Sequence, residues 1–357
     1  MTKSSALKPR FAFFFAGLIL LLSACSKNSS APKPVVPSKK WIVSTVAGSA
    51  IPGFADGDTT QVQFHNALGI VADNNGNLFV GDQGNFRIRQ VTYSGHVTTY
   101  ASKNITNPSP AFGNINSLVR DNQGNLYTIE GNLIRKITSP TNSSVLAGSL
   151  SANYLDGTGA NAAFYLIANM AIDNQGNIFL PDYDTKDNFL LRKVTPGGVV
   201  TTLLLHDNTG ISSNGLPNYH YFYAIAVDPS GNIYVTGNGN CLIKKVDPAG
   251  NVTVLAGAGN LGFVDGKGRS AQFNTILGMT CDASGNLWVC DGDNQAIRKV
   301  TPDGTVTTIA GTGTIGYADG VGTQALFKFP YGITVDNNGV IFVMDGGNNR
   351  VRKLEYK

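Results

Sequence analysis

Short apolar segments alternate with turn-forming residues along most of this chain. Leu68-Gly69-Ile70-Val71-Ala72 is followed by a polar turn with a glycine, and then by Leu78-Phe79-Val80. The next such segment is Arg87-Ile88-Arg89-Gln90-Val91. Alternate side chains of a β-strand point to opposite faces, and a glycine-containing turn between two such segments is typical of a hairpin. The pattern therefore predicts short antiparallel strands.

This hairpin pattern recurs six times, each time as Asp-x-x-Gly followed by an apolar segment. The copies begin at Asp73, Asp121, Asp173, Asp228, Asp282 and Asp336, at intervals of 48, 52, 55, 54 and 54 residues. Each copy has a third segment such as Ile297-Arg298-Lys299-Val300, and all but the last continue to a fourth such as Val306-Thr307-Thr308-Ile309. Four short antiparallel strands at this period predict one blade of a β-propeller.

The two ends of the chain indicate how the ring closes. The last repeat stops after its third strand, at Glu355-Tyr356-Lys357, and a spare fourth strand, Ile42 to Gly48, precedes the first repeat. Pairing the two would remove the exposed sheet edges. We therefore predict an all-β fold: a six-bladed β-propeller of four-stranded antiparallel blades over residues 41–357, closed by an N-terminal strand that completes the last blade.

The blade sequence resembles the NHL-repeat family over essentially all of residues 41–357. The shared pieces are Gly-Ile-x-x-Asp, Gly-Asn-Leu/Ile-aromatic-Val, Arg-Lys-Val and Val-Thr-Thr-x-Ala-Gly. Members of this family include lyases and lactonases as well as binding and scaffolding domains. The resemblance implies the propeller and leaves the activity open.

Residues 1–24 have the features of a bacterial lipoprotein signal peptide. Lys3, Lys8 and Arg10 precede an apolar run from Phe11 to Leu22, which is too short for a comfortable membrane span. The run ends in Leu22-Ser23-Ala24-Cys25, which resembles the lipobox, in which the cysteine is lipidated and becomes the first residue. The alternative is an ordinary signal peptide with an incidental cysteine.

Residues 25–40 would then be the lipidated Cys25 and a flexible tether. The chain would contact the membrane through its lipid anchor alone. By the same resemblance, Ser26 after the cysteine favours the outer membrane. We expect a lipid-anchored protein of the bacterial cell envelope, with the exposed side of the membrane left open.

Charge argues against a nucleic-acid partner. Without residues 1–24 the chain has 24 basic and 23 acidic residues, since Lys3, Lys8 and Arg10 account for three of the 27 basic ones. The basic residues recur with the repeat instead of forming one patch. We expect no nucleic acid and a monomer. Cys241, Cys281 and Cys290 are odd in number, so we expect buried thiols, and any disulfide pairing stays open.

Four of the six connections between blades share the motif aromatic-x-Asp-Gly, with a phenylalanine ten residues after the aromatic. The Asp-Gly pairs are Asp56-Gly57, Asp156-Gly157, Asp265-Gly266 and Asp319-Gly320. One interpretation is a set of carboxylates around the rim of the ring. The favoured interpretation is a turn that the two aromatic side chains hold against the blade.

A carboxylate also follows the second strand in five blades. Four of these residues are candidate binding residues: Asp82, Asp182, Asp291 and Asp345. Glu130 has this position in blade 2, and Gly237 in blade 4. A ring of acids could bind Ca²⁺ or a cationic ligand. The favoured interpretation is that each carboxylate accepts N–H bonds within its own hairpin turn, so we expect no cofactor, without excluding Ca²⁺.

The connection before blade 4 departs from the motif and contains the further binding candidates Tyr219, His220 and Tyr221. Aromatic side chains on a rim can stack on sugar rings or on apolar groups of a partner. Part of this cluster also fits the buried start of the next inner strand.

The histidines do not predict a zinc site. His65 precedes blade 1, His96 lies in a turn on the other face, and His206 and His220 precede blade 4, opposite blade 1. No residue is predicted to be catalytic or to ligate a metal. We therefore expect a membrane-tethered, non-catalytic propeller that recognises a protein, peptide or glycan through its upper loop face. The alternative is a propeller hydrolase or lyase, lactonase-like or amidating-lyase-like, with a channel site that acts with or without a metal ion.

Overall fold

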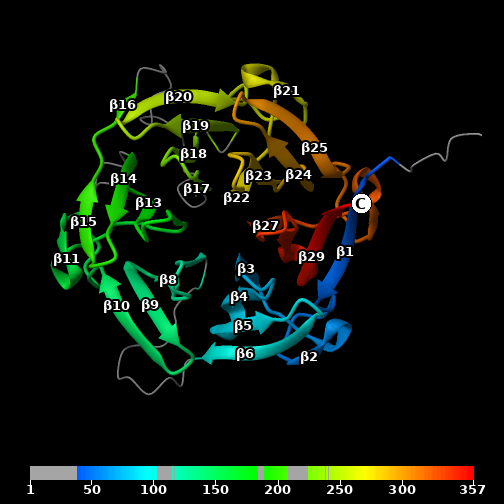
Figure 1. The fold of residues 1–357 in the computed structure, drawn as a ribbon, viewed down its shortest axis with the longest axis horizontal. Coiled ribbons are helices and arrows are strands. Elements are labelled where there is room, and N and C mark those ends of the chain that lie inside the picture. The colour runs from blue at the N-terminus through cyan, green and yellow to red at the C-terminus, as the bar shows by residue number, and fades with distance from the viewer. Residues whose placement is uncertain are drawn as a thin grey trace, which may run out of the picture. The chain divides into compact units, whose positions relative to one another are not determined.

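The computed structural model describes residues 38–102, 115, 117–183, 189–207, 224–237, 239 and 241–357. Residues from Lys39 onward belong to one compact unit. Its strands form six sheets arranged around a central axis (Figure 1). The predicted six-bladed propeller is confirmed. None of the helices in these described ranges is long and apolar enough to cross a membrane.

The four main strands of each blade follow one another from the central axis to the outside of the ring. Blade 1 contains β3 (Ala67–Ala72), β4 (Leu78–Asp82), β5 (Arg87–Val91) and β6 (His96–Ser102). Blade 2 contains β7 (Leu118–Arg120), β8 (Leu126–Glu130), β9 (Leu133–Ser139) and β10 (Asn142–Ala147). Blade 3 contains β12 (Ala171–Ile172), β13 (Ile178–Tyr183), β14 (Phe189–Val194) and β15 (Val199–Thr202).

The other three blades repeat this order. Blade 4 contains β17 (Ile225–Val227), β18 (Ile233–Gly237), β19 (Leu242–Val246) and β20 (Asn251–Ala256). Blade 5 contains β22 (Ile276–Cys281), β23 (Leu287–Asp291), β24 (Ala296–Val300) and β25 (Thr305–Gly311). Blade 6 contains β27 (Pro330–Val335), β28 (Ile341–Asp345), β29 (Arg350–Tyr356) and β1 (Trp41–Ala47).

The Asp-x-x-Gly-Asn motif builds the hairpin between the first two strands of a blade. In blade 1, Asp73 Oδ1 accepts hydrogen bonds from the backbone N–H groups of Asn75 and Asn77, both at 2.8 Å. The Asn77 side chain donates to the other carboxylate oxygen at 2.9 Å. Gly76 has φ +81°, a conformation that glycine adopts without a steric penalty. The turn is therefore specified locally, which explains why the sequence predicts it so well.

The hydrophobic core lies between neighbouring blades. Six clusters of buried side chains are present in the described ranges, and each draws residues from two adjacent blades. At the junction of blades 6 and 1, for example, Phe342 and Met344 pack in one cluster with Val80. Each sheet is thus covered on its two faces by the two neighbouring blades, and burial of this apolar surface holds the ring together.

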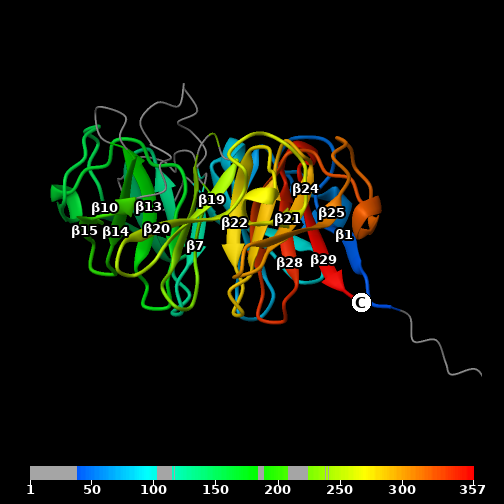
Figure 2. The same ribbon diagram turned by 90° about the horizontal axis from the view of Figure 1, so that it is seen from above.

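The N-terminal strand closes the ring as predicted. β1 pairs antiparallel with β29, from Trp41 opposite Tyr356 to Ala47 opposite Val351. The Trp41 ring also contacts Trp288 of blade 5, with 5.3 Å between ring centroids. β1 begins and β29 ends at the same edge of the ring (Figure 2). This edge belongs to the face of the ring opposite to the turns between the second and third strands of the blades. We call the face that carries those turns the upper face.

Five blades have a short fifth strand that the sequence does not predict. These strands are β2 (Gly57–Asp58), β11 (Gly157–Thr158), β16 (His206–Asp207), β21 (Gly266–Lys267) and β26 (Gly320–Val321). In four of them the glycine of the aromatic-x-Asp-Gly motif pairs antiparallel with the outermost main strand, whereas β16 pairs parallel with β20. The prediction of a turn at Asp-Gly is therefore wrong, because the glycine lies in an edge strand.

A 3₁₀ turn follows each of the four antiparallel edge strands. These turns are η1 (Thr59–Gln61), η3 (Gly159–Asn161), η4 (Gly268–Ser270) and η5 (Gly322–Gln324). Two others, η2 (Gln83–Asn85) and η6 (Gly346–Asn348), form the upper turns of blades 1 and 6. All three cysteines in the described ranges are free thiols. Cys241 and Cys290 are buried as expected, but Cys281 is partly exposed.

Candidate functional site

The candidate acid of blade 5, Asp291, is completely buried beside an arginine. Arg298 Nη1 lies 2.6 Å from Asp291 Oδ2, and Arg298 Nη2 lies 2.7 Å from Asp265 Oδ1. The same guanidinium donates to the carbonyl oxygens of Gln272 and Val264, at 3.2 and 2.9 Å. A single arginine thus ties the upper turn of the blade to the connection that precedes the blade. We call this arrangement the Asp–Arg–Asp group.

The Asp–Arg–Asp group occurs in four blades. Its members are Asp82, Arg89 and Asp56 in blade 1, Asp182, Arg192 and Asp156 in blade 3, Asp291, Arg298 and Asp265 in blade 5, and Asp345, Arg352 and Asp319 in blade 6. The four arginines and the four inner acids are all 0% exposed. Each inner acid also accepts a backbone N–H bond, as Asp291 does from Asn274 at 2.8 Å. The predicted turn contacts are present, and the arginine is the additional partner.

Aromatic rings enclose the buried guanidinium on both sides. In blade 6, Arg352 Cζ lies 5.0 Å from the ring centroids of both Tyr317 and Phe327. These are the two aromatic positions of the sequence motif. Phe327 is fully buried, whereas Tyr317 is 44% exposed. The aromatic pair therefore holds the connection against the blade, as predicted, and does so around a cation.

Two carboxylates share one guanidinium in each group, and in blade 5 their different environments shift their pKa values in opposite directions. In blade 5, burial raises the pKa of Asp291 to about 6. Burial acts on Asp265 too, but hydrogen bonds from Thr308 and Arg298 outweigh it and lower the pKa of Asp265. In blade 5 both carboxylates are therefore largely ionised at pH 7, and the inner one, Asp291, takes up a proton before Asp265 as the pH falls.

The sequence pattern indicated the acids and the Arg-Lys-Val strand separately, but the ion pairs between them were not predicted. A signal was present, because the four blades with the Asp-Gly motif are also the four with both an aspartate and an arginine at these positions. Neither of the two other blades has the complete set. Blade 2 pairs Glu130 with Arg135 at 2.8 Å, and blade 4 has Gly237 and Lys244.

A channel of about 190 Å³ runs between the first strands of the blades. Its lining includes Ile70, Leu118, Met170, Ile225 and Met279, which occupy equivalent positions in five blades. Within the described ranges, no aspartate, glutamate or histidine lines this channel. The same ranges contain no group of three His, Cys, Asp or Glu side chains that could hold a metal ion. Burial raises the pKa of the lining thiol Cys281 to about 12, so this thiol is neutral at pH 7.

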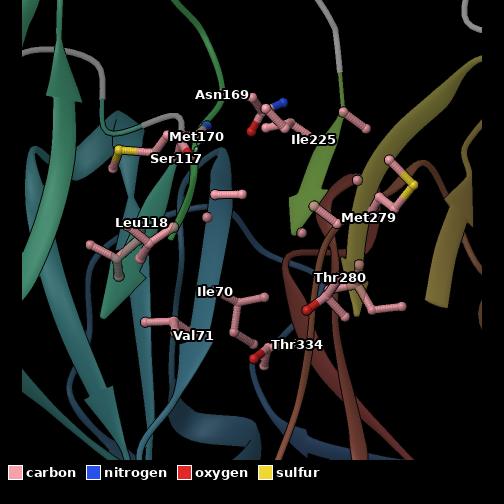
Figure 3. A pocket seen from close by; sticks show the side chains of 18 of the residues that line it. Ile70, Val71, Ser117, Leu118, Asn169, Met170, Ile225, Met279, Thr280 and Thr334 are labelled. Carbon is pink, nitrogen blue, oxygen red and sulfur yellow. Dashed lines mark hydrogen bonds between the residues drawn. The ribbon is translucent and has the colours of Figure 1, made fainter. Parts of the chain in front are cut away.

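The polar groups of the channel are few and uncharged at the end where Asn169 lies. Figure 3 shows Ser117, Asn169, Met170 and Ile225 at one end, and Thr280 and Thr334 at the other. Ser117 Oγ accepts from the Met170 N–H at 3.2 Å. The buried amide nitrogen of Asn169 has no hydrogen-bond partner. The equivalent positions hold Ser117 in blade 2 and Gly69, Ala224, Gly278 and Gly332 in the other blades, so Asn169 and Ser117 are the two residues of this set with a polar side chain.

The four motif connections carry most of the large exposed apolar side chains on the described surface. These side chains, which we call the apolar rim, are Ile51, Phe54, Leu150, Tyr154, Leu155, Leu261, Phe263, Val264, Ile315 and Tyr317, with exposures from 38% to 83%. The connections lie over the upper turns, since the side chains of Asn85, Asn294 and Asn348 donate to the carbonyls of Gly53, Gly262 and Gly316, each at 2.8 Å. The rim is therefore on the upper face.

Several predicted residues lie outside the described ranges. Tyr219, His220 and Tyr221 do, and so does Cys25. Their roles stay predictions. His96, which the sequence places in a turn on the lower face, bonds through Nδ1 to Asp58 Oδ1 at 2.6 Å.

Family models match two parts of the chain. The NHL repeat matches residues 327–354, and SBBP, a beta-propeller repeat, matches residues 215–241. Protein SUPPRESSOR OF QUENCHING 1, chloroplastic, from Arabidopsis thaliana is 38% identical over 95 residues, which are 26% of this chain and 9% of that protein. The chain thus spans less than a tenth of that relative. The match to the NHL repeat is consistent with the six-bladed propeller of the structure.

Solved structures share the fold. A Bacteroides thetaiotaomicron protein of unknown function has a TM-score of 0.69 at 23% identity, covering 90% of this chain and 77% of that chain. A Bacteroides ovatus protein named an auxiliary nutrient binding protein has a TM-score of 0.67 at 21% identity, covering 90% and 78%. Streptogramin B lyase also matches, with a TM-score of 0.54 at 12% identity, covering 89% and 98%. The fold is therefore common to binding proteins and enzymes.

Proposed function

We propose that this protein is a binding protein of the bacterial cell envelope, which holds a protein, peptide or glycan ligand on its upper face. The observation that carries the proposal is the apolar rim on connections that buried arginines lock in place. Exposed apolar side chains gathered on one face are typical of interaction sites. Rigid loops also lose little conformational freedom on binding, which favours affinity.

The chemistry of the acids and the channel supports binding over catalysis. The inner aspartates, first considered as ligand contacts, are completely buried in ion pairs and serve the proposed function by fixing the loops. Within the described ranges the channel lining has uncharged or apolar side chains apart from Arg120. The names of the Bacteroides relatives include nutrient binding, which is compatible with an envelope location. A lipid anchor at Cys25 and the outer membrane remain part of the proposal.

Residues 39–357 should capture a ligand from envelope extract, a peptide library or a glycan array. Replacing Ile51, Leu261 and Ile315 together by Ser should abolish capture, because these side chains are at least 55% exposed in the rim. The matched control replaces Val199 and Tyr356, which are exposed elsewhere, and should bind like the wild type.

Two results would contradict the proposal. One is a failure of the wild type to bind any component of the three sources. The other is a saturable Ca²⁺-dependent rise in melting temperature that Asp82→Asn or Asp345→Asn abolishes, which would favour the metal-assisted enzyme.

A further inference from the structure

Two exposed phenylalanines on the upper face have a backbone conformation that disfavours them. Phe86 has φ +54° and is 44% exposed, and Phe329 has φ +48° and is 42% exposed. Bulky residues with positive φ are rare, because Cβ approaches the following carbonyl oxygen. Exposed rings contribute little to the core, so neither folding preference nor burial accounts for them.

The equivalent positions of other blades show what the fold itself accepts there. Gln295 and Asn349 correspond to Phe86, and Asn66 and Thr275 correspond to Phe329; all four have φ between +50° and +59°. The turns are the same, since Phe86, Gln295 and Asn349 donate N–H bonds to residues three positions earlier, at 3.0 to 3.1 Å. A polar residue is therefore sufficient for the turn. Strained residues that the fold does not require are typical of functional sites.

A basic residue is next to each phenylalanine in the chain. Arg87 follows Phe86, and the exposed Lys328 precedes Phe329. The Arg87 guanidinium lies over the Phe54 ring, with 3.9 Å from Cζ to the ring centroid, and the Arg350 guanidinium lies over the Tyr317 ring, with 3.8 Å.

Arginine has this position in blades 1 and 6 only. The other blades have Leu133, Leu190, Leu242 and Ala296 there. In the described ranges neither Arg87 nor Arg350 lies within 4.0 Å of a carboxylate, and the one side-chain hydrogen bond of the pair is from Arg350 to the Asn348 carbonyl at 3.3 Å. Their N–H edges are therefore available to a ligand.

These residues lie at the upper ends of the strands of two adjacent blades, 6 and 1, and Phe329 borders blade 5, where its N–H donates to Gln295 Oε1 at 2.7 Å. Arg350 packs against Gly48, which begins the connection that carries Phe54, and Phe54 lies under Arg87. The nearby carboxylates of Asp56 and Asp319 are held by Arg89 and Arg352. We call Phe86, Arg87, Lys328, Phe329 and Arg350 the Phe–Arg arc.

The electrostatic balance distinguishes the arc from its neighbour. Each Asp–Arg–Asp group has two carboxylates and one guanidinium, and Arg87 and Arg350 offset the surplus negative charge of the groups in blades 1 and 6. With Lys328 added, the upper ends of these two blades have a surplus of positive charge. Blade 5 has no such arginine, and its upper turn adds the exposed Asp293, so its surplus is negative. An anionic ligand is therefore favoured over blades 6 and 1 and disfavoured over blade 5.

We propose that the Phe–Arg arc binds an acidic polysaccharide, with uronate carboxylates on Arg87 and Arg350 and sugar rings stacked on Phe86 and Phe329. This inference rests on the proposed binding function and names its ligand. The two phenylalanines belong to different blades, so the ligand is a chain instead of a single sugar. A peptide fits less well, because β2 and β26 already cover the outer sheet edges to which a peptide strand would add.

The test measures binding of residues 39–357 to polygalacturonate by affinity electrophoresis, with neutral dextran and poly-glutamate for comparison. The wild type should bind polygalacturonate, more weakly as NaCl is added. Phe86→Asn with Phe329→Asn should weaken binding at least tenfold. Its melting temperature should stay unchanged or rise, because asparagine tolerates positive φ. Arg87→Gln with Arg350→Gln should also weaken binding.

The matched control is Thr275→Asn, at the same turn position as Phe329 but in blade 5, which should bind like the wild type. Gln295 is kept in every variant, because its Oε1 accepts a hydrogen bond from the Phe329 N–H at 2.7 Å. The inference is overturned if dextran or poly-glutamate binds as tightly as polygalacturonate, or if the double phenylalanine variant binds normally. A fall of several degrees in its melting temperature would assign the rings a structural role. Capture of a different ligand through the rim would refute the arc alone, whereas no capture at all would refute the proposed function too.

Discussion

Arg298 is a charged residue with no exposed surface, and its position makes sense only with two carboxylates beside it. A buried ion pair offers little net stability compared with apolar residues, but loss of one partner leaves an uncompensated charge. The four Asp–Arg–Asp groups therefore make the upper loops depend on single side chains.

Arg298→Met should lower the free energy of unfolding by about 3–5 kcal/mol, because Asp291 would remain buried without its cation. Urea denaturation of residues 39–357 measures this loss. The control is Lys299→Met, the neighbouring cation that lies over Trp288 at 5.3 Å, and it should cost about 1 kcal/mol or less. Equal losses in the two variants would show that the Asp–Arg–Asp group has no special role.

Asp291 predicts a pH dependence of known sign. Its pKa in the folded protein is raised to about 6 from the ordinary 3.8. Between these values the folded protein keeps a proton that the unfolded chain has released. The stability of the wild type should therefore fall, relative to that of Asp291→Asn, as the pH rises from about 4 to 6.

Urea unfolding of both proteins at several pH values in this window tests the sign. A difference that stays constant would mean that Asp291 keeps its ordinary pKa. A difference that moves the other way would mean that Arg298 outweighs burial.

Among the elements, β1 has the largest consequence for the fold. It pairs with β29 along its length, while its residues Val46 and Ala47 enter the core between blades 6 and 1. Because the strand comes from the opposite end of the chain, its pairing holds the first and last blades together.

A chain that begins at Ser49 should melt at a lower temperature than one that begins at Lys39, and should aggregate. Without β1, the unpaired edge of β29 becomes available to other chains. Thermal melting and size-exclusion chromatography measure the two effects. The chain from Lys39 is the control, since it lacks the same preceding residues and keeps β1. Equal melting temperatures with monomeric elution would argue against closure by this strand.

For the whole molecule, the start of β1 lies at the edge opposite to the upper face. A tether that joins there would leave the apolar rim and the Phe–Arg arc directed away from the attachment point.

Cys25→Ala should release the protein from the membrane fraction or leave an unprocessed precursor, since lipidation at this cysteine is the proposed anchor. Fractionation and acyl labelling of cells that produce each form provide the measurement. Cys241→Ala, at a buried thiol within the propeller, is the matched control and should stay in the membrane fraction. Normal processing and acyl labelling of Cys25→Ala would refute the lipobox interpretation.

The number of blades and the order of their strands can be predicted from the sequence, because they depend on alternation within strands and on turns such as Asp73 to Asn77, where the interacting groups are at most four residues apart. Such local interactions repeat with every copy of the motif, so the pattern of residues is enough to identify them. Closure of the ring pairs distant segments, and the sequence predicts it because the last repeat lacks a fourth strand and a spare strand precedes the first repeat.

Which groups a ligand can reach depends on contacts between distant segments. Asp291 is an acid beside a turn, and it is inaccessible because Arg298 and a connection 33 residues from that arginine close over it. Phe86 and Phe329 are exposed on the surface, with a left-handed backbone conformation that phenylalanine rarely adopts. Burial arises from contacts between distant segments, and no local pattern of residues encodes it.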